Sequence, residues 1–381
     1  MKFNKILGHT EIKNKLISSY KDNRLSHSYL FFGTSGVGKL ALAIAYAQYL
    51  SCTDKTENDS CGQCPSCIKY EKLIHPDLHF VFPIITVNND KEKRNICDDY
   101  IKEWNEFVLS NYYFSYSDWV INLQSIVDSK SQGEIRVKES TSILNKLSYK
   151  SYESNYKIMI IWLPEFMNTE AANRILKLLE EPPENTLFFL VSDERENILS
   201  TILSRTQPIK ILGIEKETLK SEIIKKYTID ENLANDIIVN CNGSMLEAQK
   251  KIIENENTVF IFEEFTKLMR ITFSKDIINI INWADKISSI GREKQKNFIS
   301  YSLNFLREIF VYKINSNICS MTSTEKEFAK KFTNFLTKNQ VEKISKQLND
   351  TYYYIERNAN PKILLSDLAF QILYIFTEKE N

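Results

Sequence analysis

A glycine-rich stretch near the N-terminus has the residue types and spacing that suit phosphate binding. Gly33, Gly36, Gly38 and Lys39 lie in the run Gly33-Thr34-Ser35-Gly36-Val37-Gly38-Lys39, which fits the spacing G-x-x-x-x-G-K of a phosphate-binding loop. Glycines let backbone N–H groups turn toward phosphate oxygens, and a lysine adds a positive charge. The pattern predicts a site for the phosphates of ATP or ADP.

The residue after this lysine departs from the pattern of a working nucleotide site. Leu40 stands where a serine or threonine hydroxyl would bind Mg²⁺. A leucine side chain offers no ligand atom to a metal. The loop therefore predicts a phosphate cradle without its usual magnesium ligand, and whether nucleotide binds there stays open.

Four cysteines are gathered between residues 52 and 67. Cys52, Cys61, Cys64 and Cys67 follow the spacing C-x8-C-x2-C-x2-C. Four thiolates suit a closed tetrahedral zinc site, which would be structural because no coordination position is left for catalysis. The alternative is four unrelated reduced thiols. The remaining cysteines stand alone and are expected to be inert: Cys97, Cys241 and Cys319.

Composition limits the class of protein. The chain has 381 residues, enough for two or three domains, with 49 Lys+Arg and 49 Asp+Glu. This balance does not favour strong DNA binding by the chain alone. We expect a cytoplasmic protein, because we see neither a signal-type run nor the roughly 18 consecutive apolar residues of a membrane span. In that compartment clustered cysteines indicate metal rather than disulfides.

Apolar runs alternate with helical patterns over the first half of the chain. This alternation predicts an α/β fold with a parallel, doubly wound sheet. The expected strands are 29–32, 156–161, 187–191 and 209–211, and the expected helices between them include 41–50, 168–181 and 198–204.

The remaining chain divides by pattern into three further segments. Residues 84–134 do not fit the βα alternation and are interpreted as a helical insertion. Residues 213–252 predict a small helical domain, and residues 253–381 carry repeated i, i+3, i+4 apolar patterns that predict a helix bundle. The sequence thus predicts three domains, with the α/β core at 1–212.

In order along the chain, these motifs resemble the bacterial DNA polymerase III clamp-loader subunits, the delta-prime and gamma/tau family of the AAA+ class. The resemblance implies an AAA+ P-loop core with an inserted zinc module, a helical lid, and a C-terminal collar for oligomerisation. It does not cover residues 84–134. Besides the loop and the four cysteines, it rests on the stretches 6–9, 25–31, 75–78, 172–183, 201–205 and 357–362.

The resemblance also shows which ATPase parts this sequence lacks. It places the acidic pair that holds Mg²⁺ and orients water at Trp162 and Leu163, and the nucleotide-sensing arginine at Leu246. None of these side chains can do those tasks, so intrinsic ATPase activity is not expected. Glu165 could be a substitute acid, but an exposed loop or helix-start carboxylate is the favoured reading.

Arg205 is the charged residue that the resemblance assigns to catalysis. It lies in Ser204-Arg205-Thr206, where the family has Ser-Arg-Cys, and would reach in trans into the ATP site of a neighbouring subunit. The alternative is a surface arginine in a helix-terminal salt bridge.

Together these residues predict a delta-prime-like clamp-loader subunit without ATPase activity. Its expected partners are gamma/tau and delta subunits, and through them the sliding clamp and primed DNA, with no role for a membrane. One alternative is a gamma/tau-type subunit that hydrolyses ATP itself. A second is a zinc-dependent DNA-binding module.

Overall fold

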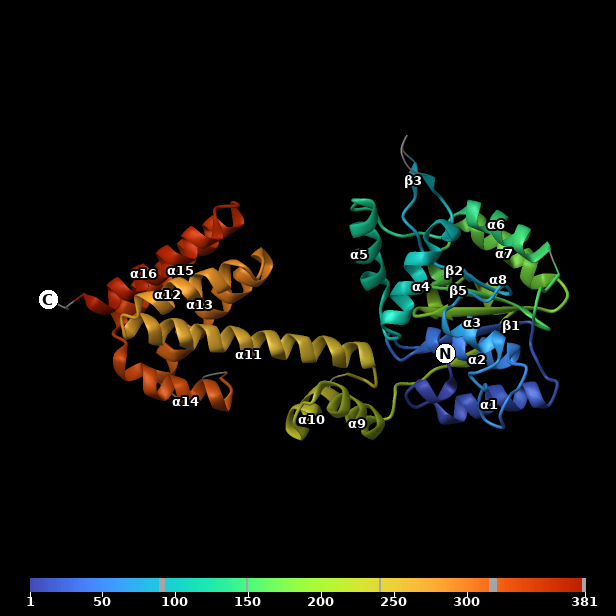
Figure 1. The fold of residues 1–381 in the computed structure, drawn as a ribbon, viewed down its shortest axis with the longest axis horizontal. Coiled ribbons are helices and arrows are strands. Elements are labelled where there is room, and N and C mark those ends of the chain that lie inside the picture. The colour runs from blue at the N-terminus through green and yellow to red at the C-terminus, as the bar shows by residue number, and fades with distance from the viewer. Residues whose placement is uncertain (89–92, 149, 240, 315–320, 379–381) are drawn as a thin grey trace. The chain divides into compact units, whose positions relative to one another are not determined.

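The computed structural model describes residues 1–88, 93–148, 150–239, 241–314 and 321–378 (Figure 1). The expected thiol Cys319 lies outside these ranges. The chain forms two compact units, Met1–Ile252 and Ile253–Asn381. Within the described ranges, no helix has both the length and the apolar character needed to cross a membrane.

The first unit is built on a five-stranded sheet in the order β2-β5-β6-β1-β7. Every strand pair in it is parallel, so the predicted α/β sheet is confirmed. β5 and β6 are buried along their whole length, because their continuous apolar runs face helices on both sides. The strands are β1 (Ser28–Phe32), β2 (Leu78–Val81), β5 (Lys157–Trp162), β6 (Thr186–Ser192) and β7 (Gln207–Lys210).

Helices cover both faces of this sheet. Figure 1 shows α1 and α2 on one side of it and α6 and α7 on the other. α2 is buried at every position, which fits its Ala-rich sequence. The helices are α1 (Thr10–Lys21), α2 (Lys39–Ser51), α3 (Pro65–Glu71), α6 (Val137–Ser148), α7 (Thr169–Glu180) and α8 (Ser200–Leu203). Short 3-10 turns occupy Phe3–Lys5, Pro164–Phe166 and Arg195–Asn197.

Residues 84–134 form a largely helical insertion that packs on the core. Trp104 and Trp119 are fully buried; Trp104 stacks on Phe82, which directly follows β2, and Trp119 meets the same ring edge-on. The sequence did not predict the small antiparallel hairpin at its start. Its elements are β3 (Val87–Asn88), β4 (Lys93–Arg94), a 3-10 turn at Cys97–Tyr100, α4 (Ile101–Ser110) and α5 (Tyr116–Val127).

A small helical lid completes the first unit. It contains α9 (Lys216–Tyr227), α10 (Glu231–Val239) and the first turns of α11 (Met245–Phe273), which continues into the second unit. The lid has its own apolar core, to which Leu219 and Ile237 contribute.

The second unit is a bundle of helices around a separate apolar core. Phe265, Trp283, Leu306 and Leu348 are among its buried residues. Its helices after α11 are α12 (Ile277–Ser288), α13 (Arg292–Ile314), α14 (Ser323–Phe332), α15 (Lys338–Glu356) and α16 (Pro361–Thr377), with a 3-10 turn at Thr333–Phe335.

Candidate functional site

The glycine-rich loop joins β1 to α2 at the carboxyl edge of the sheet, where ligands bind in open α/β folds. Two of its glycines are required by their surroundings. A side chain on Gly33, at φ +147°, would come within 2.1 Å of the Ile211 carbonyl oxygen. One on Gly36, at φ +75°, would come within 2.3 Å of Leu246 Cβ. The loop therefore has the backbone of a phosphate cradle, packed closely against its neighbours.

Lys39, which the sequence assigns to phosphate, is bound by oxygens of this chain. Its Nζ lies 2.7 Å from Asp193 Oδ1 and donates to the carbonyl oxygens of Gly33 (2.8 Å) and Thr34 (2.5 Å). The side chain is only 4% exposed. Burial lowers the pKa of Lys39, and the charge of Asp193 partly opposes this. The Lys39 ammonium group is thus bound by the carbonyl oxygens of its own loop and by Asp193.

Asp193 is a site residue that sequence reasoning missed. It directly follows β6, which pairs with β1, so both strands deliver their carboxyl ends to the same edge. Asp193 could have been identified by one signal. It is a carboxylate directly after a buried strand, and that strand lies beside β1, which precedes the glycine-rich loop.

The space beside the loop is almost completely filled. Leu40 and Trp162 are buried there at 5% and 4% exposure. The remaining cavity measures about 20 Å³, which holds about one water molecule, whereas ligand pockets usually span roughly 300–1,000 Å³. Its lining is Gly36, Gly38, Lys39, Leu40, Tyr112, Phe114, Trp162, Val191 and Asp193.

Glu165 lies in the first turn of the 3-10 helix Pro164–Phe166, but it is not exposed. Its carboxylate turns inward, and Oε1 accepts hydrogen bonds from the backbone N–H groups of Asp193 (2.9 Å) and Glu194 (3.2 Å). Burial raises the pKa of Glu165. Glu165 is thus a helix-start carboxylate, as one of the expected alternatives holds, but it is not exposed, because this side chain holds the loop that follows β6.

The lid touches the phosphate-binding loop directly. Ser244 Oγ donates to the Ser35 carbonyl oxygen (2.9 Å), and the N–H of Met245 donates to the Gly36 carbonyl oxygen (3.0 Å). Leu246, where the resemblance expects a sensor arginine, is 5% exposed and packs against Gly36. The position therefore contributes packing where an arginine would contribute charge.

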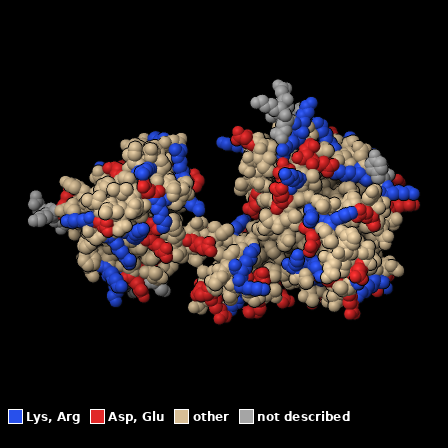
Figure 2. Space-filling view, in the orientation of Figure 1, with Lys and Arg blue, Asp and Glu red and all other residues tan. Residues whose placement is uncertain are grey.

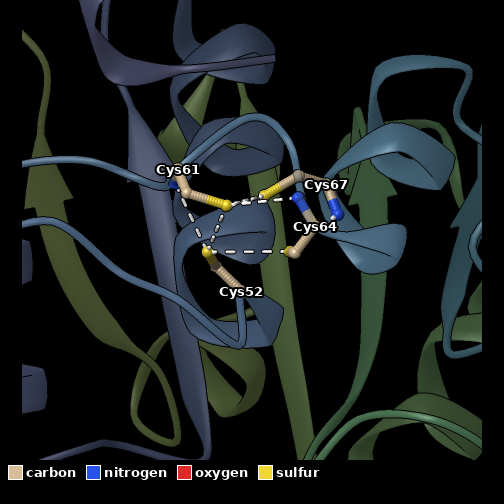
Figure 3. Close-up of side chains that lie close together, drawn as sticks. All are labelled: Cys52, Cys61, Cys64 and Cys67. Atoms are coloured by element: carbon tan, nitrogen blue, oxygen red, sulfur yellow. Dashed lines mark hydrogen bonds between the residues drawn. The ribbon is translucent and has the colours of Figure 1, made fainter.

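The four cysteines converge, and their sulfur atoms fit a tetrahedral metal site (Figure 3). Three Sγ–Sγ distances are 3.6 Å for Cys52–Cys61 and 3.9 Å for both Cys61–Cys67 and Cys64–Cys52, and all four sulfur atoms lie within 4.8 Å of one another. A tetrahedron with Zn–S bonds of about 2.3 Å has edges of about 3.8 Å. The donor set and its geometry therefore suit Zn²⁺, which these four residues would hold.

Two elements position these cysteines. Cys52 follows the last residue of α2, Cys64 caps the N-terminus of α3, and Cys67 lies within α3. Backbone N–H groups of Cys64 and Cys67 donate to the Sγ atoms of Cys61 and Cys64, at 3.3 and 3.4 Å. The backbone at the start of α3 therefore helps to fix the sulfur atoms of Cys61 and Cys64.

Arg205 lies just after α8 and is partly exposed. Its Nη2 is 2.7 Å from Glu180 Oε1, and its Nη1 donates to the Thr201 carbonyl oxygen (3.0 Å). In this conformation Arg205 makes the salt bridge that the alternative hypothesis expects. Exposed ion pairs contribute at most about 1 kcal/mol, so releasing the side chain toward a partner would cost little. Thr206 is buried and donates to the Leu203 carbonyl oxygen (3.2 Å).

Comparison with known proteins finds similarity to subunits of DNA polymerase III. Residues 8–215 match the family described as "DNA polymerase III, delta subunit". The chain is 26% identical over 369 residues to DNA polymerase III subunit gamma of Buchnera aphidicola subsp. Acyrthosiphon pisum (strain APS), covering 92% of this chain and 86% of that protein. It is 25% identical over 249 residues to subunit delta' of Bacillus subtilis (strain 168), covering 63% of this chain and 61% of that protein, which is less than two thirds of its length.

Among solved structures, the DNA polymerase III gamma subunit-related protein of Thermotoga maritima is similar. The alignment covers 94% of this chain and 98% of that one, with 13% identity and a TM-score of 0.34.

Proposed function

Since the chain belongs to the DNA polymerase III, delta subunit family of AAA+ clamp-loader proteins, we propose that it is an ATPase-inactive, delta-prime-like subunit. The observation that carries this proposal is the state of the phosphate-binding loop. Lys39 is bound by Asp193 and by carbonyl oxygens of the loop, beside a cavity of about 20 Å³. A lysine held in this way is poorly placed to contact the phosphates of a substrate.

The replaced residues remove the remaining parts of an ATPase. Hydrolysis needs a metal ligand after the lysine, an acidic residue at the end of another strand of the sheet, here β5, and a group that orients water. Leu40, Trp162 and Leu163 occupy these positions and supply neither a ligand nor a base. We expect ATP turnover by the isolated chain to stay at background.

In the proposed mechanism Arg205 acts on the ATP of another subunit. Its guanidinium would leave Glu180 and stabilise charge on the transferring phosphoryl group of a neighbouring gamma/tau-type subunit. The assembly, which would also include a delta-type subunit, would then load a sliding clamp on primed DNA. Zn²⁺ held by the four cysteines would stabilise the loop that carries them.

Replacement of Arg205 in a reconstituted complex tests this role. Arg205→Ala should lower the rate of ATP hydrolysis by about 10³-fold at the site that this arginine completes. Arg205→Lys should be only partly active there. Arg24→Ala, at an exposed arginine, should leave the rate unchanged. An unchanged rate for Arg205→Ala in an intact complex would exclude the trans role.

The gamma/tau-type alternative has one observation in its favour, because the Buchnera gamma subunit aligns over most of the chain. For the isolated protein, the gamma/tau-type alternative predicts ATP turnover, which is the opposite of what the ATPase-inactive proposal predicts. ATP turnover well above background that disappears in Lys39→Ala would establish this alternative and remove the ATPase-inactive proposal.

A further inference from the structure

We infer that residues 111–114 of the insertion are a built-in replacement for nucleotide, because they fill the space beside the phosphate-binding loop and tie that loop to the lid. The segment connects α4, which ends at Ser110, to α5, which begins at Tyr116. The inference rests on the proposed function and extends it from an inactive site to an occupied one.

Two aromatic side chains of this segment close the space that faces Lys39. Tyr112 and Phe114 line the small cavity together with Trp162. The Phe114 ring lies 5.1 Å from the Trp162 ring and 4.8 Å from the Phe107 ring, measured between centroids. Phe114 is only 9% exposed, so it is fixed in an aromatic cluster rather than lying loosely over the loop.

Tyr113 contacts the loop at Gly38. A side-chain carbon added to Gly38 would lie 3.0 Å from Tyr113 Cε1, so the ring rests on the loop backbone. The Tyr113 hydroxyl accepts a hydrogen bond from the N–H of Leu7 (3.2 Å). The same ring belongs to the apolar core of the lid with Ile214 and Leu219. One buried side chain therefore contacts the N-terminal segment, the loop and the lid.

Asn111 fixes the segment and extends it to α11. Its Oδ1 accepts from the N–H of Tyr113 (3.1 Å), and its Nδ2 donates to the Tyr113 carbonyl oxygen (2.9 Å). The same Nδ2 donates to Gln249 Oε1 (3.3 Å). The insertion is thus hydrogen-bonded to the helix whose first turn also packs on Gly36.

These contacts hold the lid and the core together, as a ligand bound by both parts would do. A ligand held by both parts stabilises their joined state in proportion to its concentration. Residues 111–114 belong to the chain, so their effect does not depend on ligand concentration. The lid should therefore stay joined to the core at any level of ATP.

The first experiment measures nucleotide binding by the full chain with a fluorescent ATP analogue, with and without Mg²⁺. The wild-type protein should give no saturable signal and no shift in melting temperature. The variant Tyr112→Ala/Phe114→Ala should gain saturable binding, which the added Lys39→Ala substitution should abolish. Tyr152→Ala/Tyr374→Ala removes two exposed tyrosines and should behave as the wild type.

The outcomes separate this inference from the proposed function. Saturable binding by the wild-type chain without turnover would overturn the replacement and leave the inactive role intact, whereas binding with turnover would overturn both. A folded Tyr112→Ala/Phe114→Ala variant that still fails to bind would also overturn the inference.

A second measurement does not require that variant to fold. Tyr113→Ala should raise hydrogen exchange of lid amides in α9 and α10 by about tenfold or more, because it removes a contact between lid and core. ATP should not change lid exchange in the wild type. Lid protection that rises with ATP in the wild type would overturn the inference.

Discussion

At the scale of single residues, the ion pair of Lys39 and Asp193 joins a buried ammonium to a carboxylate that is 25% exposed. Removing only the carboxylate leaves a buried charge without its partner, which is more costly than removing both groups. Asp193→Ala should therefore lower the free energy of unfolding by about 3 kcal/mol, while Lys39→Met/Asp193→Ala should be less destabilised.

Denaturant unfolding of Lys39→Met, Asp193→Ala and the double variant measures this coupling. Strictly additive effects would show that the pair contributes no mutual stabilisation.

His79 provides a second prediction at this scale. Burial lowers the pKa of His79 to about 4. The charges of Lys146 and Lys157 also lower this pKa, whereas the charges of Asp77 and Asp98 oppose the lowering. The unfolded chain therefore binds this proton more tightly than the folded chain. The contribution to stability is complete above pH 6.5 and is lost as the pH falls toward 4, by at most about 3 kcal/mol.

The variant His79→Gln should remove this part of the acid sensitivity. Between pH 7 and pH 4.5 its unfolding free energy should fall less than that of the wild type, because glutamine does not titrate. The comparison cancels acid effects that both proteins share. Parallel curves for the two proteins would contradict the prediction.

At the scale of elements, the four cysteines should make α3 and its preceding loop depend on metal. The protein should carry one Zn²⁺ per chain, and a chelator should lower its melting temperature and increase proteolysis between residues 52 and 71. Cys64→Ala should lose the zinc. Cys241→Ala changes an isolated buried thiol and should keep it. Unchanged stability after complete metal removal would exclude a structural role.

The sequence predicted the elements whose signal is local. β5 and β6 are continuous apolar runs, and α2 is an Ala-rich segment after a glycine turn, so period and composition were sufficient. The convergence of the cysteines followed from their spacing. These features depend on residues that are close together in the chain.

Features that depend on tertiary contacts were not predicted. The insertion was predicted to be helical, but the packing of Trp104 and Trp119 against Phe82 was not predicted. Glu165 turns inward after Leu163, whose left-handed φ of 57° is unusual for leucine and is not visible in the sequence. Asp193 meets Lys39 only because β6 pairs with β1.

At the scale of the whole molecule, charge is evenly distributed on the visible surface. Figure 2 shows Lys and Arg interspersed with Asp and Glu on both units, in keeping with the equal totals of 49. A surface of this kind does not steer the chain strongly toward DNA. This fits the proposal that DNA is engaged by an assembly rather than by this subunit alone.

Each unit has an apolar core of its own. Cutting the chain between the units should therefore separate the proposed action of Arg205 from the proposed role of the helix bundle in oligomerisation. The sheet and lid clusters lie within residues 1–252, and the bundle cluster around Trp283 and Leu348 lies within residues 253–381. We expect both fragments to fold. We also expect the bundle to provide the oligomerisation surface, because apolar side chains of α12 and α16 are exposed on it, including Ile278 and Ile363.

Co-purification with gamma/tau and delta subunits tests this division. Fragment 253–381 should enter the complex without supporting the ATPase stimulation that depends on Arg205, and fragment 1–252 should enter weakly or not at all. In the full chain, Ile278→Asp/Ile363→Asp should weaken assembly because it places charge on the proposed apolar surface. Ile121→Asp, on the exposed side of α5 in the first unit, is the matched control and should assemble normally. Stable entry of fragment 1–252 alone would move the main assembly surface to the first unit and contradict the collar assignment.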